Sequence, residues 1–300
     1  MKAARLLSYG DIDSFSIDDI PTPVPADGEI LIKIEASAVN PFDLMVRRGD
    51  MARFIPLALP AVLGGDAAGV VAGIGDGVTG FSMGDRVIAD FVLNGHGAHA
   101  AYGVVPATAA ALLPDNLSFE QGASLPKAGL MGRQTVEALR VVAGSRVLIS
   151  GGLGAVGRAA IQYLKELHAM PVAGVRPDRL EEARDLAGEA IDITSVPVEA
   201  TFEHAISAAA PAALNLMRHV RDGGQVASIV PVPEGANPGS RVRIHELYHR
   251  TDAATLSAVA RVASLGLLVI PIARVYPLER IGAAHTAVAG GVRGKVVLKH

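Results

Sequence analysis

The segment with the clearest capacity for chemistry is a glycine-rich turn. It reads Ser150-Gly151-Gly152-Leu153-Gly154-Ala155-Val156-Gly157, and Gly152, Gly154 and Gly157 satisfy the spacing G-x-G-x-x-G. Glycines in this pattern allow a tight turn, close approach of the main chain to a pyrophosphate, and close packing of the next helix on the strand. A helix start also offers unbonded N–H groups and a positive dipole end. The turn therefore indicates a dinucleotide site.

The elements around the turn decide between this reading and a plain glycine-rich loop, because the chain has 33 glycines. Arg146 to Ser150 is a short apolar run typical of a buried strand. Ala155 to Leu167 has the spacing of an amphipathic helix, and Pro171 to Val175 reads as a second buried strand. Strand, turn, helix and strand in this order favour a Rossmann-type unit.

The end of the second strand distinguishes the two nicotinamide dinucleotides. An acidic residue there would accept a hydrogen bond from the ribose 2′-OH and repel a 2′-phosphate. This chain has Arg176 at that point and Arg179 one turn later. Two guanidinium groups could hold a phosphate, so we predict NADP(H). The alternative is that both arginines are solvated at a helix start that Asp178 caps.

The rest of the chain supplies the elements that must position this turn. Before residue 118 short alternating runs separated by turns predict a β-rich region, with strands at 29–35, 69–72 and 84–89. Helical spacing follows at 119–123, 130–139, 177–187 and 253–266, and further strands are expected at 225–230 and 295–298. The alternation of strands and helices predicts an α/β fold with a doubly wound parallel sheet.

Composition excludes several classes of function. A formal charge of -3 on 300 residues gives no basic field for nucleic acid. The chain has no cysteine, which removes disulfides, thiolate catalysis and cysteine-built zinc sites. No signal sequence is recognisable at the start, and the longest uncharged stretch, Phe91 to Pro114, is broken by polar residues, prolines and glycines. We therefore expect a cytoplasmic protein without a membrane span.

Short segments in a fixed order resemble the medium-chain dehydrogenase/reductase superfamily, and within it the zinc-independent quinone oxidoreductases. Each segment is only moderately specific, but together they cover nearly the whole chain. Besides the glycine turn they are Met1-Lys2-Ala3, Val39-Asn40-Pro41-Phe42-Asp43 with Arg47 and Gly49, Gly65-Asp66-Ala67-Ala68-Gly69-Val70-Val71, Gly84-Asp85-Arg86-Val87, Leu125-Pro126-Lys127, Tyr276-Pro277-Leu278-Glu279 and Gly294-Lys295-Val296-Val297-Leu298.

The resemblance implies a β-rich, GroES-like catalytic domain formed by residues 1–118 and 268–300, with a Rossmann domain at 119–267 inserted into it. It also implies that NADPH lies in the cleft between the domains and that hydride passes to a quinone or a conjugated carbonyl. The partner would be a small-molecule substrate, and the assembly a homodimer formed through the Rossmann domain.

The same resemblance implies roles for residues beyond the glycine turn. Asn40 would orient the nicotinamide or the substrate, and Asp43 would stabilise the loop beside it. The other implied cofactor contacts are Lys127 near the ribose or a phosphate, Ser228, Ile229 and Val230 behind the nicotinamide, and Lys295. The competing interpretation of Asn40 and Asp43 is structural, because Asn-Pro commonly begins a turn and Asp43 could cap the helical turn that follows.

The chain departs from the family pattern at several positions. Methionines 45 and 51 replace aromatic residues after Asn-Pro, Met131-Gly132 replaces a Thr-Ala pair, Ala101 replaces a glutamate, and 204–207 is an unusual strand. A tyrosine proton donor is thereby missing, which disfavours enoyl-thioester reduction. Quinone reduction tolerates this because the anionic hydroquinone can take a solvent proton. A cofactor-binding sensor or scaffold that has lost catalysis is the alternative function.

A rival motif is His245-Glu246-Leu247-Tyr248-His249, a literal match to the H-E-x-x-H signature of zinc peptidases. That chemistry needs both imidazoles on one face of a helix. Arg241 to Ile244 alternates like a strand, so the peptidase is disfavoured and a partly exposed helix start near a domain hinge is expected instead. His96 and His99 form a second possible metal pair, expected to be exposed in a substrate loop; no metal site is predicted.

Overall fold

The computed structural model describes residues 1–92 and 94–300, so Leu93, within the predicted substrate loop, lies outside the described residues. The described chain divides into two compact units, Met1–Lys127 with Thr251–His300, and Ala128–Arg250. The expected domain boundaries at 118/119 and 267/268 differ from this division. Helices α2 (Phe119–Ala123) and α7 (Ala253–Ser264) belong to the first unit because they pack on its strands β3, β5 and β8.

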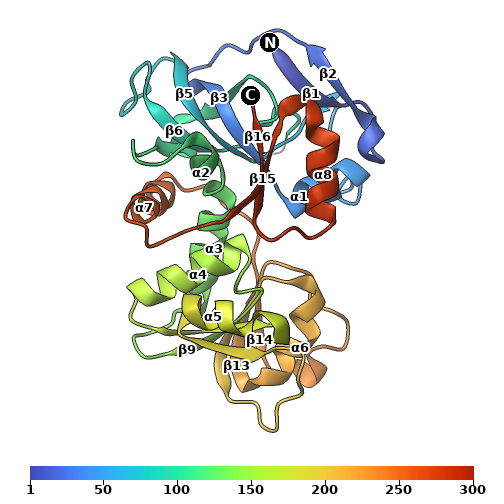
Figure 1. The fold of residues 1–300 in the computed structure, drawn as a ribbon, viewed down its shortest axis with the longest axis vertical. Helices are drawn as coiled ribbons and strands as arrows, with labels where there is room; N and C mark the ends of the chain where they lie inside the picture. The colour runs from blue at the N-terminus through green and yellow to red at the C-terminus, as the bar shows by residue number, and fades with distance from the viewer. Residues whose placement is uncertain (93) are drawn as a thin grey trace. The chain divides into compact units, whose positions relative to one another are not determined.

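The first unit is rich in strands (Figure 1). Its larger sheet has the order β15-β16-β3-β5-β6-β8, and β7 also pairs with β3. The smaller sheet has the order β2-β1-β4. The strands are β1 (Lys2–Leu6), β2 (Phe15–Asp19), β3 (Glu29–Val39), β4 (Ala61–Val62), β5 (Asp66–Ile74), β6 (Arg86–Asp90), β7 (Tyr102–Pro106), β8 (Ala110–Leu112), β15 (Ile272–Pro277) and β16 (Lys295–Lys299).

Strand β3 follows from its period of two. Ile30, Ile32 and Ile34 are buried on one face and join a cluster that includes Val87 and Phe91. Burying each such side chain contributes about 1.5–3 kcal/mol. Because a slip of one residue would expose all three isoleucines, this pattern sets the register that delivers the end of β3 to its neighbours.

The second unit contains a parallel sheet with the strand order β11-β10-β9-β12-β13-β14. Numbered along the chain, this is the order 3-2-1-4-5-6 of a Rossmann fold, which confirms the predicted fold class. The carboxyl ends of these strands meet at one edge. The strands are β9 (Arg146–Ser150), β10 (Met170–Val175), β11 (Glu189–Asp192), β12 (Phe202–Ser207), β13 (Val220–Ser228) and β14 (Arg243–Glu246).

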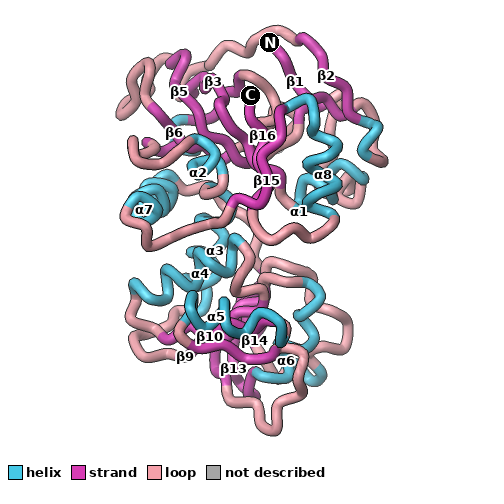
Figure 2. The backbone as a smooth tube through the Cα atoms, viewed as in Figure 1, coloured by secondary structure: helices cyan, strands magenta, loops and turns pink. Residues whose placement is uncertain are grey.

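Figure 2 distinguishes the helices from the strands and loops by colour. The predicted helix at 177–187 is a short 3-10 turn, Pro177–Arg179, followed by α5, because Arg179 leaves helical geometry with φ -124° and ψ 6°. The remaining α-helices are α1 (Pro41–Arg48), α3 (Pro126–Leu139), α4 (Ala155–Glu166), α5 (Leu180–Ala187), α6 (Ala213–His219) and α8 (Ile281–Ala289).

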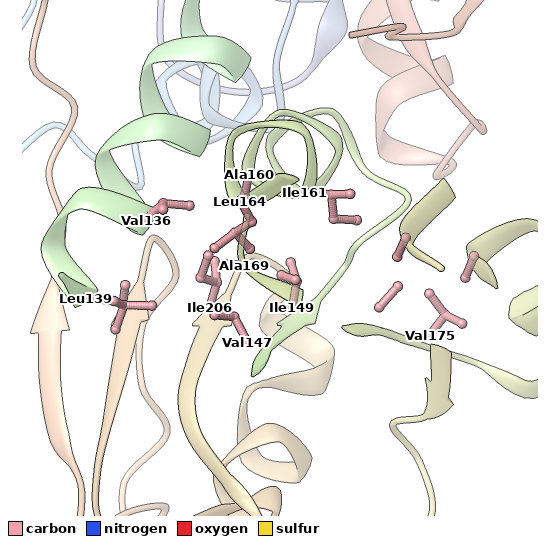
Figure 3. Close-up of a cluster of buried hydrophobic side chains, with 14 residues drawn as sticks. Val136, Leu139, Val147, Ile149, Ala160, Ile161, Leu164, Ala169, Val175 and Ile206 are labelled. Carbon is pink, nitrogen blue, oxygen red and sulfur yellow. The ribbon is translucent and has the colours of Figure 1, made fainter. Parts of the chain in front are cut away.

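The core of the second unit packs α4 against β9. Val147 and Ile149 of β9 pack in one cluster with Ile161 and Leu164 of α4, and with Leu139 of α3 (Figure 3). All five side chains are at most 1% exposed. Because both ends of the turn between β9 and α4 are anchored in this cluster, the start of α4 is fixed relative to the sheet edge.

Candidate functional site

The glycine turn lies between β9 and α4, at the carboxyl edge of the parallel sheet. Gly151 has φ 70°, in the left-handed region that favours glycine. A Cβ on Gly157 would lie 2.3 Å from the carbonyl oxygen of Gly151, and one on Gly152 would lie 2.9 Å from the Cβ of Ala173. Backbone and core therefore leave no room for a side chain at Gly152 or Gly157.

The start of α4 is open to an anion. Gly154 is its N-cap residue and donates its N–H to the carbonyl of Gly151 at 2.8 Å, and no side chain caps the helix. The N–H groups of the first turn, including those of Ala155 and Val156, have no acceptor within the helix. Uncapped N–H groups at a positive dipole end fit a pyrophosphate. The turn therefore fits a dinucleotide.

The predicted arginines are both engaged with carboxylates. The Arg176 Nε lies 3.6 Å from Asp178, and both side chains are largely exposed. Arg179 donates to the Glu182 carboxylate from Nε at 2.9 Å and from Nη2 at 2.5 Å. Asp178 therefore pairs with Arg176, whereas Arg179 lies against helix α5.

A further arginine, missed from sequence, joins Arg179. Arg158 of α4 donates from Nη2 to Glu182 at 3.0 Å and from Nε to the carbonyl of Leu153 at 3.1 Å. Burial lowers the pKa of Arg158, while the Glu182 carboxylate acts in the opposite direction. Two guanidinium groups thus share one carboxylate beside the turn, which leaves local positive charge. Its position directly after Gly157, the third glycine of the motif, is the feature of the sequence that could have identified Arg158.

Serines form a row along the carboxyl edge. Ser150, Ser207 and Ser228 are register partners on β9, β12 and β13. Ser228 donates to the carbonyl of Val230 at 2.7 Å, and the N–H of Ile229 donates to the carbonyl of Ser207 at 3.1 Å. The segment Ser228–Val230 is therefore brought to the edge that carries the glycine turn. Ser207, missed from sequence, has a buried Oγ without a hydrogen-bond partner in the described chain.

The first unit contains a buried lysine–aspartate cluster, formed by Asn40, Asp66, Asp90, Lys127, Thr251 and Lys295. The Lys295 Nζ donates to Asn40 Oδ1 at 2.6 Å and to Asp66 Oδ2 at 3.0 Å, and Asn40 Nδ2 donates to Asp66 Oδ2 at 2.9 Å. Strand register brings these three side chains together, because Asp66 lies opposite Ala38 on β3 and Val296 lies opposite Val39. The ends of three strands therefore carry this triangle of polar groups.

Lys127 extends the cluster. Its backbone N–H donates to Asp66 Oδ1 at 2.7 Å, and its Nζ contacts the Asp90 carboxylate and donates to the carbonyl of Phe91 at 3.0 Å. Thr251 Oγ1 donates to the other Asp90 oxygen at 2.5 Å. Gly65 makes room, because its Cβ would lie 2.4 Å from Lys127 Cε. The buried Asp66 thus joins Lys127 to Lys295, and the buried Asp90 joins Lys127 to Thr251.

Asp66 and Asp90 are the main residues that sequence reasoning missed in this cluster. Asp66 lies within Gly65-Asp66-Ala67, one of the segments that resemble the family, but the resemblance implies no role for its side chain. Both carboxylates are at most 1% exposed although they stand at the ends of apolar strands. A carboxylate next to a buried apolar run is the signal that could have found them, because a buried charge requires a partner.

Asp43 has a local structural role. Its carboxylate accepts the backbone N–H of Asn40 at 2.7 Å, and Asn40 is the N-cap residue of α1. This is the helix-capping interaction that the sequence left as an alternative. Burial raises the pKa of Asp43 to about 6, against the effect of that hydrogen bond. Asp43 therefore fixes the backbone of Asn40, whose side chain enters the lysine–aspartate cluster.

The H-E-x-x-H match does not form a peptidase site. His245 and Glu246 belong to strand β14, and the residues through Arg250 are not helical, so the expected helix start is wrong. The strand arises because Ile244 pairs with Val226 of β13. A strand cannot place the two histidines as one helical turn would. Among residues 1–92 and 94–300, no group of three or more His, Asp or Glu side chains could hold a metal ion.

The second histidine pair is also separated. His96 is exposed, but His99 is fully buried, so its expected exposure is wrong. The reason is Gly64: a Cβ there would lie 2.6 Å from His99 Nδ1, and without it the ring fits against the backbone. Ser37 Oγ lies 3.1 Å from His99 Nδ1 and 2.8 Å from His300 Nε2.

His99 and His285 should make the protein sensitive to acid. Both are fully buried, and burial lowers the pKa of His285 to about 3 and that of His99 well below 6.5. Below pH 6.5 the unfolded chain therefore binds more protons than the folded chain does. The contribution of these histidines to the free energy of unfolding is complete above that pH and is lost as the pH falls. The His285 imidazole should lower the free energy of unfolding by about 2 kcal/mol between pH 6.5 and 5, and His99 should act in the same direction. Urea unfolding at both pH values measures this.

The control for this prediction compares a buried with an exposed histidine. His285→Leu should reduce the pH dependence of the unfolding free energy, whereas His96→Leu should leave it unchanged. Asp43 has the opposite effect on the pH dependence of the unfolding free energy. Because its pKa is raised in the folded chain, it contributes stability below about pH 4, and this contribution is lost as the pH rises through about 6. Equal pH dependence in the His285→Leu variant and the parent chain would refute the assignment.

Comparisons with known proteins bear on both units. Residues 26–115 match the family model of the alcohol dehydrogenase GroES-like domain, and residues 187–298 match that of zinc-binding dehydrogenase. No described helix has the length and apolar character needed to cross a membrane.

Several similar proteins are quinone oxidoreductases. The chain is 30% identical to quinone oxidoreductase of Sus scrofa over 99% of its own length and 97% of that protein. It is 35% identical to that of Homo sapiens, over 55% of this chain and 50% of that protein, so this match spans about half of the relative. The solved structure of the quinone oxidoreductase from Coxiella burnetii is similar, with a TM-score of 0.87, 27% identity and coverage of 100% of this chain and 99% of that one.

The GroES-like match, the 3-2-1-4-5-6 parallel sheet and the full-length relative agree with the ordered segments recognised in the sequence. The chain therefore belongs to the medium-chain dehydrogenase/reductase superfamily of oxidoreductases, among its quinone oxidoreductase-like members.

Proposed function

We propose that this protein reduces quinones or related conjugated carbonyls with NADPH and without zinc. The observation that carries the proposal is the uncapped glycine turn with Arg158 and Arg179 beside it. The turn suits a pyrophosphate, and the two guanidinium groups suit the additional 2′-phosphate. Arg176 is exposed beside them and could add a further contact. The similarity to quinone oxidoreductases over the full length of the chain supports the choice of acceptor.

The bound nucleotide supplies the hydride in this proposal, and the protein contributes positioning. Asn40 orients the nicotinamide or the substrate, with its amide fixed by Lys295 and Asp66 and its backbone fixed by Asp43. Lys127 lies near the ribose or a phosphate, and Ser228, Ile229 and Val230 lie behind the nicotinamide. No strong side-chain acid is needed, because the hydroquinone anion takes a proton from solvent.

Zinc has no suitable donor set in the described residues. A catalytic zinc site takes three protein ligands from Cys, His, Asp or Glu. The chain has no cysteine, and the His, Asp and Glu side chains at 1–92 and 94–300 do not gather into such a group. The proposal therefore assigns no step to a metal ion.

Oxidation of NADPH, followed at 340 nm with a panel of quinones and enones, tests the proposed reaction. Turnover that is insensitive to a metal chelator is expected. The alternative, a sensor or scaffold, predicts NADPH affinity with no turnover across the panel, and the departures at Met45, Met51, Ala101 and Met131 are the reason to keep it. The homodimer and the cytoplasmic location stay predictions, which sedimentation and cell fractionation would check.

Glu182 should tune the preference for NADPH. Its carboxylate occupies the guanidinium groups of Arg158 and Arg179, so a 2′-phosphate must displace it. A hydrogen bond to a charged group is worth about 1.5–3 kcal/mol, and tenfold in affinity is about 1.4 kcal/mol. Glu182→Gln should therefore tighten NADPH binding about tenfold and leave NADH binding unchanged, as measured by calorimetry.

The neighbouring carboxylate provides the control. Glu181 is exposed in the same helical turn, so Glu181→Gln makes the same change in net charge and should have a much smaller effect on NADPH binding. Arg179→Gln should weaken NADPH binding about tenfold and spare NADH. If Glu182→Gln changes the affinity for NADPH no more than Glu181→Gln does, and changes the affinity for NADH by the same amount, the 2′-phosphate does not bind at Arg158 and Arg179.

A further inference from the structure

A basic pocket lies in the second unit, near the end of α3 and the edge strand β14. It has a volume of about 560 Å³ and is lined by Glu137, Ala138, Arg140, Gln225, Arg243 and His245. The lining comes from α3, the residue after it, and the neighbouring strands β13 and β14, where Gln225 and Arg243 are register partners. His245, left over from the rejected zinc motif, thus lies in a pocket.

The pocket carries positive charge that the described chain does not neutralise. The guanidinium groups of Arg140 and Arg243 make no side-chain hydrogen bond or ion pair within residues 1–92 and 94–300. The acidic residue in the lining, Glu137, accepts a hydrogen bond from Arg133 Nε at 3.1 Å. Two guanidinium groups therefore face one pocket, while the nearby carboxylate is already paired with a third.

His245 adds a hydrogen-bonding group between these charges. Its Nε2 lies 2.9 Å from Gln225 Oε1, and an amide oxygen only accepts, so Nε2 donates and Nδ1 is the nitrogen left for a ligand. Burial, Arg243 and Arg140 lower the pKa of His245, in that order. A bound anion would offset the repulsion from both arginines and favour the protonated imidazole, which can donate from Nδ1.

This pocket is separate from the glycine turn. Gln225 is opposite His204, and His204 is opposite Val147 near the start of β9, whereas the turn follows Ser150 at the end of β9. Strands β12 and β13 also lie between β9 and β14. At about 4.8 Å between neighbouring strands, the pocket is displaced sideways by about 10–14 Å from β9.

We propose that this pocket binds a phosphate group, free or as a small phosphate monoester, independently of the nucleotide. Arg140 and Arg243 hold the phosphate oxygens, because guanidinium groups donate paired hydrogen bonds that match phosphate. His245 donates a further bond from Nδ1. The pocket volume exceeds that of free phosphate, so the ester's organic part can lie beside Gln225 and Ala138.

Calorimetric titration with inorganic phosphate and with glycerol 3-phosphate tests the proposal. Titrations are made in the presence of saturating NADPH, so that the glycine turn is occupied; if no nucleotide binds, the same titrations on the free protein still test the pocket. Binding is expected, and Arg243→Gln and Arg140→Gln should each weaken it at least tenfold. Arg218→Gln is the matched control, because Arg218 is exposed on α6 and lies outside the pocket lining.

Proton uptake gives a second readout. Titration at pH 7 in buffers of different ionisation enthalpy should show that the parent chain takes up more protons per bound phosphate than His245→Gln does. The change in ionisation of the phosphate itself is common to both chains and cancels in this difference. The groups that face this imidazole are Arg140 and Glu137 from the α3 side and Arg243 on its own strand. Tighter binding of the ester than of free phosphate would identify an ester site. Affinity that is unchanged in both arginine variants, or absent in the parent chain, would overturn the proposal.

Discussion

Gly157→Ala should weaken NADPH binding by at least a hundredfold. The new Cβ would lie 2.3 Å from the carbonyl oxygen of Gly151 and 2.7 Å from the Cα of Gly152, and neither backbone atom can move without opening the turn. The pyrophosphate would then lose both the close approach of the main chain and the N–H groups of α4. Calorimetry or quenching of NADPH fluorescence measures the loss.

Gly154→Ala is the control for Gly157→Ala. Gly154 has φ -73° and ψ 165°, which any residue adopts, and its Cβ would meet only the Gly151 oxygen at 3.1 Å. A smaller loss of NADPH affinity is expected there. Circular dichroism establishes that both variants fold. Undiminished NADPH affinity in folded Gly157→Ala would remove the glycine turn as the binding site, and with it the proposed function.

Lys295→Met should destabilise the fold by about 3–5 kcal/mol. The substitution leaves the buried Asp66 carboxylate without the ammonium group 3.0 Å away, and it also removes the donor to Asn40 Oδ1. Removing one partner of a buried ion pair costs this much because the remaining charge stays desolvated. Urea unfolding at pH 7.5 measures the change in the free energy of unfolding.

Two further variants separate this effect from a general loss of charge. Lys299 lies on the same strand, and its side chain is 66% exposed. Lys299→Met should therefore change the unfolding free energy by less than about 1 kcal/mol. The double variant Lys295→Met with Asp66→Asn should recover part of the loss, because no unpaired charge remains. If Lys295→Met is no more damaging than Lys299→Met, the lysine–aspartate cluster does not stabilise the unit.

The nucleotide turn and the fold class were accessible from sequence because they depend on local patterns. Gly152, Gly154 and Gly157 are recognisable by their spacing within one short segment, and Gly157 is required by contacts with Gly151 and Gly152 of the same turn. Gly152, in contrast, is required by Ala173 of the neighbouring strand β10. The apolar runs of β9 and β10 and the spacing of α4 likewise express neighbours in the chain. The strand–helix alternation then restricts the topology to a doubly wound sheet.

Contacts between distant segments were not accessible in this way. Asp66 meets Lys295 across 229 positions, and His99 is buried because Gly64 leaves space for its ring. Strand pairing, not motif spacing, placed His245 on β14, and α7 joined the first unit through its contact with β8. Local residue types determine backbone preference and periodicity. Burial and charge pairing depend instead on which strands become neighbours, and strand neighbours are set only when the whole chain has packed.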